Sequence, residues 1–206
     1  MKYDPNKHHR RSIRLKGYDY AQAGAYFVTV CVQGRDCALG EVVDGQMVLN
    51  DTGRIADQFW LAVADHFDNV KIDAWVTMPN HTHSIIVIGR GAVAAPTVAA
   101  PTVAAPTVAA PTVAAPNDVE TGGETPPLQS PVLGRIVAYF KYQTTKSINQ
   151  MCETPGIRFW QRNYWEHVVR NEADLNRIRE YIQNNPARWA EDQLHPDAPP
   201  NPFNRG

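Results

Sequence analysis

The first part of the chain holds several short apolar runs, separated by polar turns, whose residue types are those of β-strands. The run AYFVTVCV at 25–32 is rich in β-branched and aromatic residues, which favours a buried strand. Two short alternating runs surround Asp44-Gly45, a dipeptide typical of tight hairpin turns. The runs VKIDAWVTM and HSIIVI predict two more strands, joined by a turn at Pro79-Asn80.

In three other places the apolar residues recur with the period of an α-helix. The first predicted helix covers Gly53–Phe67, with Asp51 or Thr52 as its N-cap and an apolar face of Ile55, Phe59, Ala62, Val63 and Phe67. The second covers Val132–Ile148, with apolar Val132, Leu133, Ile136, Val137 and Phe140. The third begins after the cap Asn171, buries Leu175, Ile178 and Ile182, and ends near Asn184 because Pro186 follows. An aromatic, strand-like segment at 158–169 precedes the third helix.

A pentapeptide repeat separates the two halves. VAAPT recurs between residues 91 and 116 with a proline at every fifth position, and a polar stretch continues to residue 131. Regular prolines remove backbone donors and forbid a helix or a central strand, and the small side chains bury little surface. We therefore expect a linker whose length is unimportant to the chemistry.

The order of elements predicts an α+β fold, an antiparallel sheet with helices packed on it. The expected organisation is a basic N-terminal arm at 1–24, a first half of one domain at 25–90, the linker at 91–131, a second half at 132–190 and a loose tail at 191–206.

The composition indicates which class of protein this is and where in the cell we expect it. Hydrophobic residues make up 43% of the 206 residues and charged residues 20%, as in ordinary globular chains. There is no apolar run of about 20 residues and no secretory signal, so we expect a cytoplasmic protein without membrane contact. The three cysteines, Cys31, Cys37 and Cys152, show no CxxC spacing and are expected to be reduced thiols.

The net charge of −1 hides an uneven distribution. Basic residues gather before residue 17 and again between residues 132 and 170, where they outnumber acidic ones. Such clusters can bind phosphates on a chain that is neutral overall. The candidate DNA contacts are Arg10, Arg11, Arg14, Lys141, Lys146, Arg162 and Arg170. A solvated arm and ordinary surface charge would give the same pattern.

Two motifs suggest chemistry. His81 and His83 lie two apart in a predicted strand, so both imidazoles project from one face and can form half of a divalent-metal site. Tyr181 and Asn185 lie four apart on a predicted helix, where a phenol can serve as a nucleophile and an amide oxygen as a hard metal ligand. Each motif by itself is also common in proteins without a metal or an active site.

Several ordered blocks together resemble a known family. MPNHTHSIIVI, LGRIVAYFKYQTTKSIN and FWQRNYWEHVVRNEADLNRIREYIQNNPARW are similar to the single-tyrosine HUH transposases, and within them to the REP-associated tyrosine transposases. The opening RRSIRLKGYDYAQAGAYFVTVCVQGR resembles the same branch. The likeness covers nearly the whole chain apart from the VAAPT linker and the last residues.

The resemblance implies a ferredoxin-like domain that cleaves single-stranded DNA near hairpins through a 5′-phosphotyrosine intermediate and rejoins ends. It places the catalytic tyrosine at Tyr181 and the ligands of Mg²⁺ or Mn²⁺ at His81, His83 and Asn185. Hairpin DNA is the implied partner, the nucleoid the implied surroundings, and a homodimer is compatible with it.

Other candidates stay open at this stage. Tyr142 and Tyr164 are rival nucleophiles, although neither has an amide one helical turn later. Aromatic residues alternate with cations at 139–142 and 159–165, where exposed rings could stack unpaired bases. Glu166-His167 could be a proton shuttle or a simple strand pair. Two other functions compete with the transposase: a hairpin-binding module without turnover, and a metal phosphoesterase that uses water and leaves Tyr181 structural.

Overall fold

The computed structural model describes residues 18–20, 22–89 and 133–199. Within them, four antiparallel strands form one sheet in the order β4-β5-β1-β6, from β1 (Gly24–Cys31), β4 (Val70–Thr77), β5 (His81–Ile88) and β6 (Trp165–Val169). Helices α1 (Asp51–His66) and α2 (Leu133–Met151) complete a β-α-β-β-α-β succession with this sheet. The predicted α+β, ferredoxin-like antiparallel sheet is confirmed.

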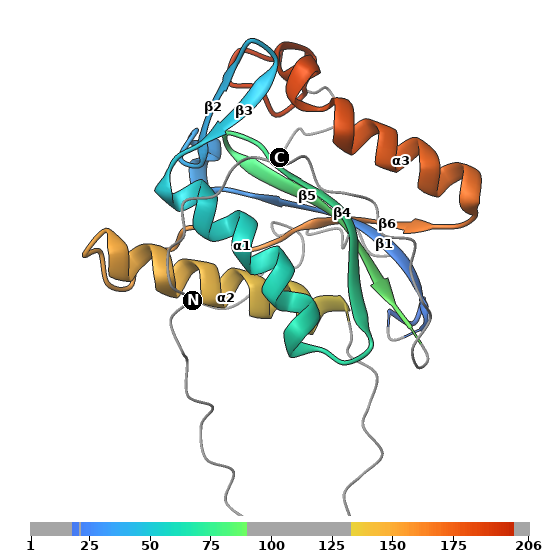
Figure 1. The fold of residues 1–206 in the computed structure, drawn as a ribbon. Helices are drawn as coiled ribbons and strands as arrows, with labels where there is room; N and C mark the ends of the chain where they lie inside the picture. The colour runs from blue at the N-terminus through green and yellow to red at the C-terminus, as the bar shows by residue number, and fades with distance from the viewer. Residues whose placement is uncertain (1–17, 21, 90–132, 200–206) are drawn as a thin grey trace, which may run out of the picture.

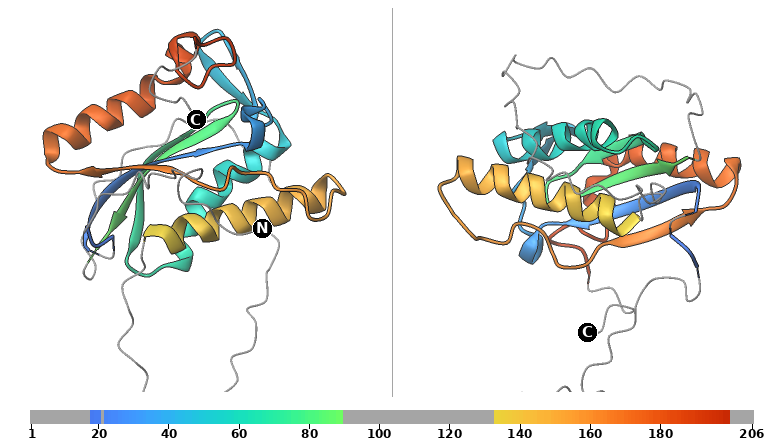
Figure 2. Two further views of the ribbon diagram at one scale, coloured as in Figure 1. Left: turned by 180° about the vertical axis from the view of Figure 1, so that it is seen from behind. Right: turned by 90° about the horizontal axis from the view of Figure 1, so that it is seen from below.

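Two additions extend this succession. The hairpin of β2 (Gly40–Val43) and β3 (Gln46–Leu49) follows β1. Helix α3 (Glu172–Asn184) follows β6 and leads into the short 3-10 helix η2 (Pro186–Glu191). Figure 1 shows α3 on one side of the sheet and α1 with α2 on the other. The views in Figure 2 agree with this three-layer arrangement.

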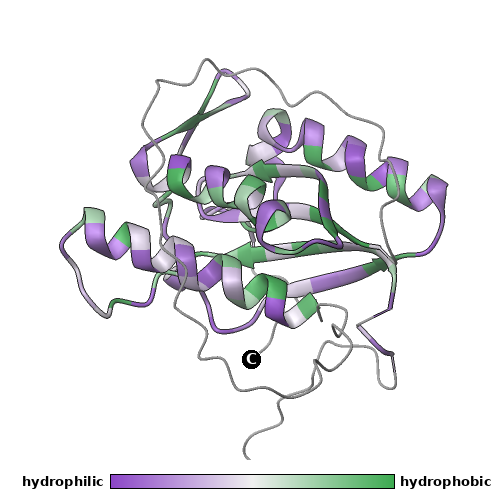
Figure 3. Ribbon diagram, turned by 60° about the horizontal axis from the view of Figure 1, so that its bottom comes forward, coloured by the Kyte–Doolittle hydropathy of each residue, from purple (hydrophilic) through white to green (hydrophobic). Residues whose placement is uncertain are grey.

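The sheet therefore has two buried faces with different cores. Tyr26, Val28 and Val30 of β1 point to α1 and α2, where Trp60 stacks on Phe140 with ring centroids 3.9 Å apart. On the opposite face, a small cluster of Phe27, Ile85, Ile178 and Ile182 joins the sheet to α3. Hydrophobic and hydrophilic residues alternate along all three helices (Figure 3), which lets each helix bury one side.

Local chemistry explains the turns. Asp44 and Gly45 have φ angles of 50° and 74°, so both central residues of the β2–β3 hairpin are left-handed, as an Asp-Gly turn predicts. The side chain of Asn171 accepts a hydrogen bond from the backbone N–H of Asp174 and caps α3, as expected.

Some sequence predictions were wrong in detail. The N-cap of α1 is Asn50, whose Oδ1 accepts from the backbone N–H of Gly53, and Asp51 and Thr52 already lie inside the helix. The face of α1 that is fully buried holds Ala56, Trp60 and Val63, while Phe59 is only partly buried.

The segment 158–169 is a strand only from Trp165 onward. Before that, Trp160 makes an isolated bridge with Val32, and its indole N–H donates to Thr144 Oγ1 at 2.7 Å. The segment thus meets the chain at the end of β1, where the backbone N–H of Gln161 also donates to the carbonyl of Cys31, while the Trp160 ring is buried against Phe140 of α2.

Candidate metal and tyrosine site

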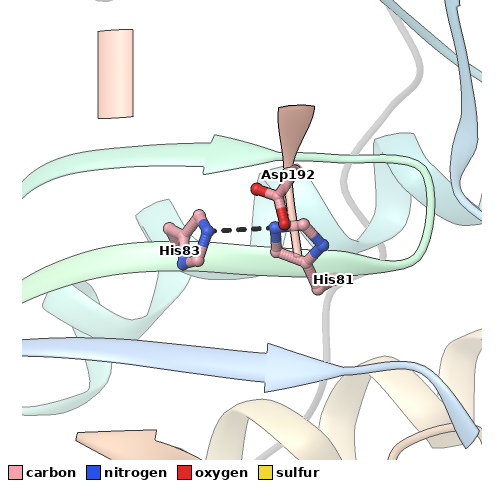
Figure 4. A group of neighbouring side chains, drawn as sticks. All are labelled: His81, His83 and Asp192. Carbon is pink, nitrogen blue, oxygen red and sulfur yellow. Dashed lines mark hydrogen bonds between the residues drawn. The ribbon is translucent and has the colours of Figure 1, made fainter. Parts of the chain in front are cut away.

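Neighbouring strands position the two histidines. His81 and His83 lie on β5, next to β1, and face α3 together with Ile85. Both are buried, with 0% and 4% exposure. Their Nε2 atoms are 3.0 Å apart (Figure 4). Adjacent ligands at about 2.1 Å from an octahedral centre are also about 3.0 Å apart, so the spacing suits a shared cation.

Hydrogen bonds determine which nitrogen of His81 holds its proton. Asn80 Nδ2 donates to the carbonyls of Leu194 and Arg35, so Asn80 Oδ1 faces His81 Nδ1 at 2.8 Å. An amide oxygen only accepts, and Nδ1 of His81 must therefore donate. Nε2 of the neutral ring then keeps its lone pair, the form that a metal ligand requires.

His83 has a more adaptable partner. Its Nδ1 lies 2.8 Å from Thr29 Oγ1 on the paired strand β1. A hydroxyl can donate or accept, so Thr29 supports either neutral tautomer of His83. In the tautomer with the proton on Nδ1, His83 directs a second lone pair to the same point as His81.

Burial keeps both imidazoles neutral. It lowers the pKa of His81 to about 3, with a smaller contribution from the positive charge of Arg35. Burial also holds the pKa of His83 well below 6.5, helped by His81 and opposed by the carboxylate of Asp192. Neutral imidazoles at physiological pH bind metals without first losing a proton.

Two oxygen donors complete this group. Asn185, the C-cap of α3, is 3% exposed, and its Oδ1 has no hydrogen-bond partner among the described residues. Asp192 follows η2 and points its carboxylate toward the imidazoles (Figure 4), and its ligand atom and those of His81 and His83 all lie within 4.8 Å of one another. Two imidazoles, a carboxylate and an orphaned amide oxygen fit a divalent cation.

Asp192 was missed by the sequence reasoning, which expected a loose tail from residue 191. The structure places residues 191–198 in hydrogen-bonded turns, and Leu194 accepts from Asn80 next to the site. No local motif marks Asp192 in a Pro- and Asp-rich segment. Asp192 reaches the histidines only because a turn brings the chain back to β5.

Tyr181 lies beside the histidines in the same chain. Its Oη is 3.2 Å from His83 Nε2 and 3.5 Å from Asp192 Oδ2, and its side chain is 42% exposed. Partial burial, followed by the charge of Asp192, raises the pKa of Tyr181 to about 12. The phenol is therefore protonated, and it needs a proton acceptor or a nearby positive charge to become a nucleophile.

A groove of about 1130 Å³ opens in front of Tyr181. Its walls are α3 on one side and the segment from Gln161 to His167 on the other, and Phe27, Thr29 and His83 of the sheet also line it. Arg35, Arg177 and Arg188, which were not among the predicted DNA contacts, also line it, together with the carboxylates of Glu180, Glu191 and Asp192. This groove gives an extended ligand access to the phenol.

The predicted DNA contacts are scattered. Arg10, Arg11 and Arg14 lie outside the described residues. Arg162 and Arg170 are exposed at the two ends of β6, and Lys146 is exposed on α2, on the opposite side of the sheet from the histidines. Lys141 is engaged inside the protein, because its ammonium donates to the carbonyls of Gln161 and Asn163 and burial lowers its pKa to about 8.

The rival candidates lie elsewhere. Tyr142 is 65% exposed on α2, away from the histidines. Tyr164 lies under the ammonium of Lys141, 5.5 Å from its ring centroid. Glu166 and His167 point to opposite faces of β6, and His167 pairs with Asp174 at 2.8 Å instead. Among the three tyrosines considered, Tyr181 alone meets the histidine pair.

Known proteins similar to this chain indicate its family. No family model matches the chain. An uncharacterised protein of Haemophilus influenzae is 37% identical over 199 residues, which cover 95% of this chain and 98% of that protein. The chain belongs to the same family as this protein.

A second relative from Haemophilus influenzae, named as a proposed REP-associated tyrosine transposase, is 32% identical over 79 residues, 34% of this chain and 44% of that protein. The chain thus resembles a REP-associated tyrosine transposase, as its motifs indicate.

Two solved structures are also similar. A REP-associated tyrosine transposase bound to a REP hairpin aligns with a TM-score of 0.49 and 18% identity over 87% of this chain and 76% of its own. A proposed transposase of Deinococcus radiodurans aligns with a TM-score of 0.41 and 12% identity over 83% and 95%. Among the described helices, none has the length and hydropathy needed to cross a membrane.

Proposed function

We propose that this protein is a metal-dependent endonuclease and strand-transferase that cleaves single-stranded DNA near hairpins, with Tyr181 as the covalent nucleophile. The observation that carries the proposal is the distance of 3.2 Å between the Tyr181 hydroxyl and His83 Nε2, beside two buried imidazoles and a half-buried carboxylate that could hold a metal ion. The named transposase relative adds support to it.

His81, His83 and Asn185 would hold the cation, and Asp192 would supply a further oxygen to it. The Nε2 atoms of His81 and His83 lie 3.0 Å apart, and the hydrogen bonds that their Nδ1 atoms make with Asn80 and Thr29 orient the two rings. A bound Mg²⁺ or Mn²⁺ supplies positive charge that offsets the charge developing on the phosphoryl oxygens and favours the phenolate.

The residues of the chain account for the nucleophile. Tyr181 is held by edge-on contacts with Phe27 and His83, at centroid distances of 6.0 and 5.2 Å, which fixes the direction of its hydroxyl. Asp192 Oδ2 is placed to accept the phenol proton. Oη forms a bond to the phosphorus as the bond from phosphorus to the 3′ oxygen breaks, leaving a 5′-phosphotyrosine and a 3′-hydroxyl.

The substrate class follows from the groove and from the relatives. The groove is lined by aromatic rings, three arginines and three carboxylates, and rings in a long groove suit the unpaired bases of a flexible strand, whose phosphates the arginines can contact. A REP hairpin is the DNA named with one of the similar structures, and we extend that partner to this chain as part of the proposal.

The decisive experiment detects a covalent protein–DNA adduct. Labelled single-stranded hairpin DNA with unpaired flanks is incubated with the full chain and Mn²⁺ and resolved on a denaturing gel. We expect an adduct and a released 3′ end with the wild type, neither with Tyr181→Phe nor after chelation, and both with the control Tyr142→Phe.

Two other results would replace the proposal. Hairpin binding without any cleavage would make the protein a binding module. Cleavage that persists in Tyr181→Phe would indicate a phosphoesterase that uses water, and Tyr181 would then be structural.

A further inference from the structure

Trp165 is the first residue of β6, the edge strand of the sheet, and it lines the groove in front of Tyr181. Its side chain is 45% exposed, although its large apolar ring would be stabilised by burial. Ligand sites are concave and lined mainly by apolar and aromatic side chains, so an exposed indole inside a groove is a candidate binding position.

The ring is held in a fixed orientation. Trp165 and Phe27 pack edge to face, with ring centroids 5.8 Å apart and an interplanar angle of 75°. His167, two residues along the same strand, lies parallel to Trp165 with an interplanar angle of 7°. Asp174 on α3 holds His167 by a 2.8 Å hydrogen bond. An indole fixed in this way loses little freedom when a ligand stacks on it.

The position is close to the proposed chemistry. Phe27 contacts both Trp165 and Tyr181, at centroid distances of 5.8 and 6.0 Å. A ligand on the free part of the indole is therefore a near neighbour of a phosphate in front of the Tyr181 hydroxyl.

We propose that Trp165 is the stacking platform for one unpaired nucleobase that flanks the phosphate attacked by Tyr181. This inference rests on the proposed function. A base in a duplex has both faces covered by its neighbours, so only an unpaired nucleotide offers a free face to the indole. Trp165 thereby selects single-stranded DNA next to the scissile bond and fixes the position of cleavage relative to the hairpin.

The test measures the energetic coupling between Trp165 and individual bases. Binding is measured in the Tyr181→Phe background, which prevents turnover, with hairpin DNA in which each unpaired nucleotide in turn is made abasic. With Trp165 present, we expect one abasic position near the scissile phosphate to weaken binding about 5- to 100-fold. With Trp165→Leu, the same abasic position should change binding less than about twofold, because the stacking partner is already missing.

Two further variants sharpen the comparison. Trp165→Phe keeps a smaller aromatic face and should retain part of the coupling, and it replaces Trp165→Leu if the leucine variant does not fold. Tyr142→Leu removes an aromatic side chain with 65% exposure on α2, on the far side of the sheet, and should leave the abasic profile unchanged.

The outcomes separate this inference from the proposed function. If the wild type forms the covalent adduct and no abasic position couples to Trp165, the stacking role is wrong and the nuclease proposal stands. A change of self-association in Trp165→Leu with an unaltered abasic profile would likewise overturn it in favour of a protein interface. If the wild type neither binds nor cleaves hairpin DNA, both proposals fail.

Discussion

Thr29 shows how a residue outside the proposed ligand set shapes the site. It forms the 2.8 Å bond to His83 Nδ1 from the neighbouring strand, and the two residues are directly paired in the β1–β5 register. A ligand imidazole is oriented through its other nitrogen, and the loss of such a partner weakens metal binding by about 10- to 100-fold in metalloproteins.

Replacement of Thr29 by valine tests this role. Thr29→Val keeps the shape of the side chain and removes its hydroxyl, so we expect Mn²⁺ affinity to fall about 10- to 100-fold. Calorimetric titration of the purified protein measures it. Thr145→Val makes the same change on α2, on the other side of the sheet, and should leave the affinity unchanged. Equal affinities for Thr29→Val and the wild type would contradict the assignment of His83 as a ligand.

At the scale of elements, a partly buried ion pair helps to hold α3 against the sheet, in addition to its apolar contacts. Arg179 donates to Asp73 from Nε and Nη2 at 2.7 and 2.5 Å, and Asp73 lies at the irregularity in β4 between Ile72 and Ala74. The Asp73 side chain is 6% exposed and that of Arg179 is 21% exposed. The bidentate pair thus fastens the helix of Tyr181 to the edge strand of the sheet.

Removal of this pair should be costly. Arg179→Met leaves the carboxylate of Asp73 without its partner, and we expect the free energy of unfolding to fall by about 1–3 kcal/mol. Arg177→Met on the same helix breaks an exposed pair with Asp174 and should cost less than about 1 kcal/mol. Urea unfolding of both variants gives the comparison, and similar losses would show that the Asp73 pair does not anchor α3.

At the scale of the whole molecule, the large hydrophobic core and the candidate site lie on opposite faces of the sheet. Its face toward α1 and α2 holds the large core of Trp60 and Phe140, and its face toward α3 holds the histidines beside a small apolar cluster. Two buried, neutral imidazoles lower the stability of the fold at acidic pH, because each binds a proton more readily in the unfolded chain.

This effect predicts a pH dependence of stability. The unfolded pKa of histidine is near 6.5, while His81 titrates at about 3 in the folded protein and His83 well below 6.5. The stability contributed by neutral histidines is thus complete above about pH 6.5 and is lost as the pH falls below it, by up to about 1.4 kcal/mol per pH unit for each. Urea midpoints between pH 7.5 and 5 should decline less in His81→Asn, and equal declines would contradict the depressed pKa.

The local patterns of the chain determined most of the elements. The apolar runs rich in β-branched and aromatic residues predicted β1, β4 and β5, Asp44-Gly45 predicted the hairpin, and Asn171 with Pro186 predicted the bounds of α3. These signals succeed because strand propensity, turn geometry and capping depend on neighbours in sequence. The pairing of His81 with His83 on one face is of the same kind, and so is the spacing of Tyr181 and Asn185.

Only the tertiary structure decided which residues contact these motifs. Asp192 joins the histidines through a turn after η2, Asn80 sets the position of the proton on His81 and Thr29 orients His83, and Lys141 is engaged by backbone carbonyls of a distant loop. Likewise, Trp60 and not Phe59 became the buried residue of α1, because α2 supplies the ring on which it stacks. Such outcomes depend on burial and on partners far along the chain, for which the local sequence holds no signal.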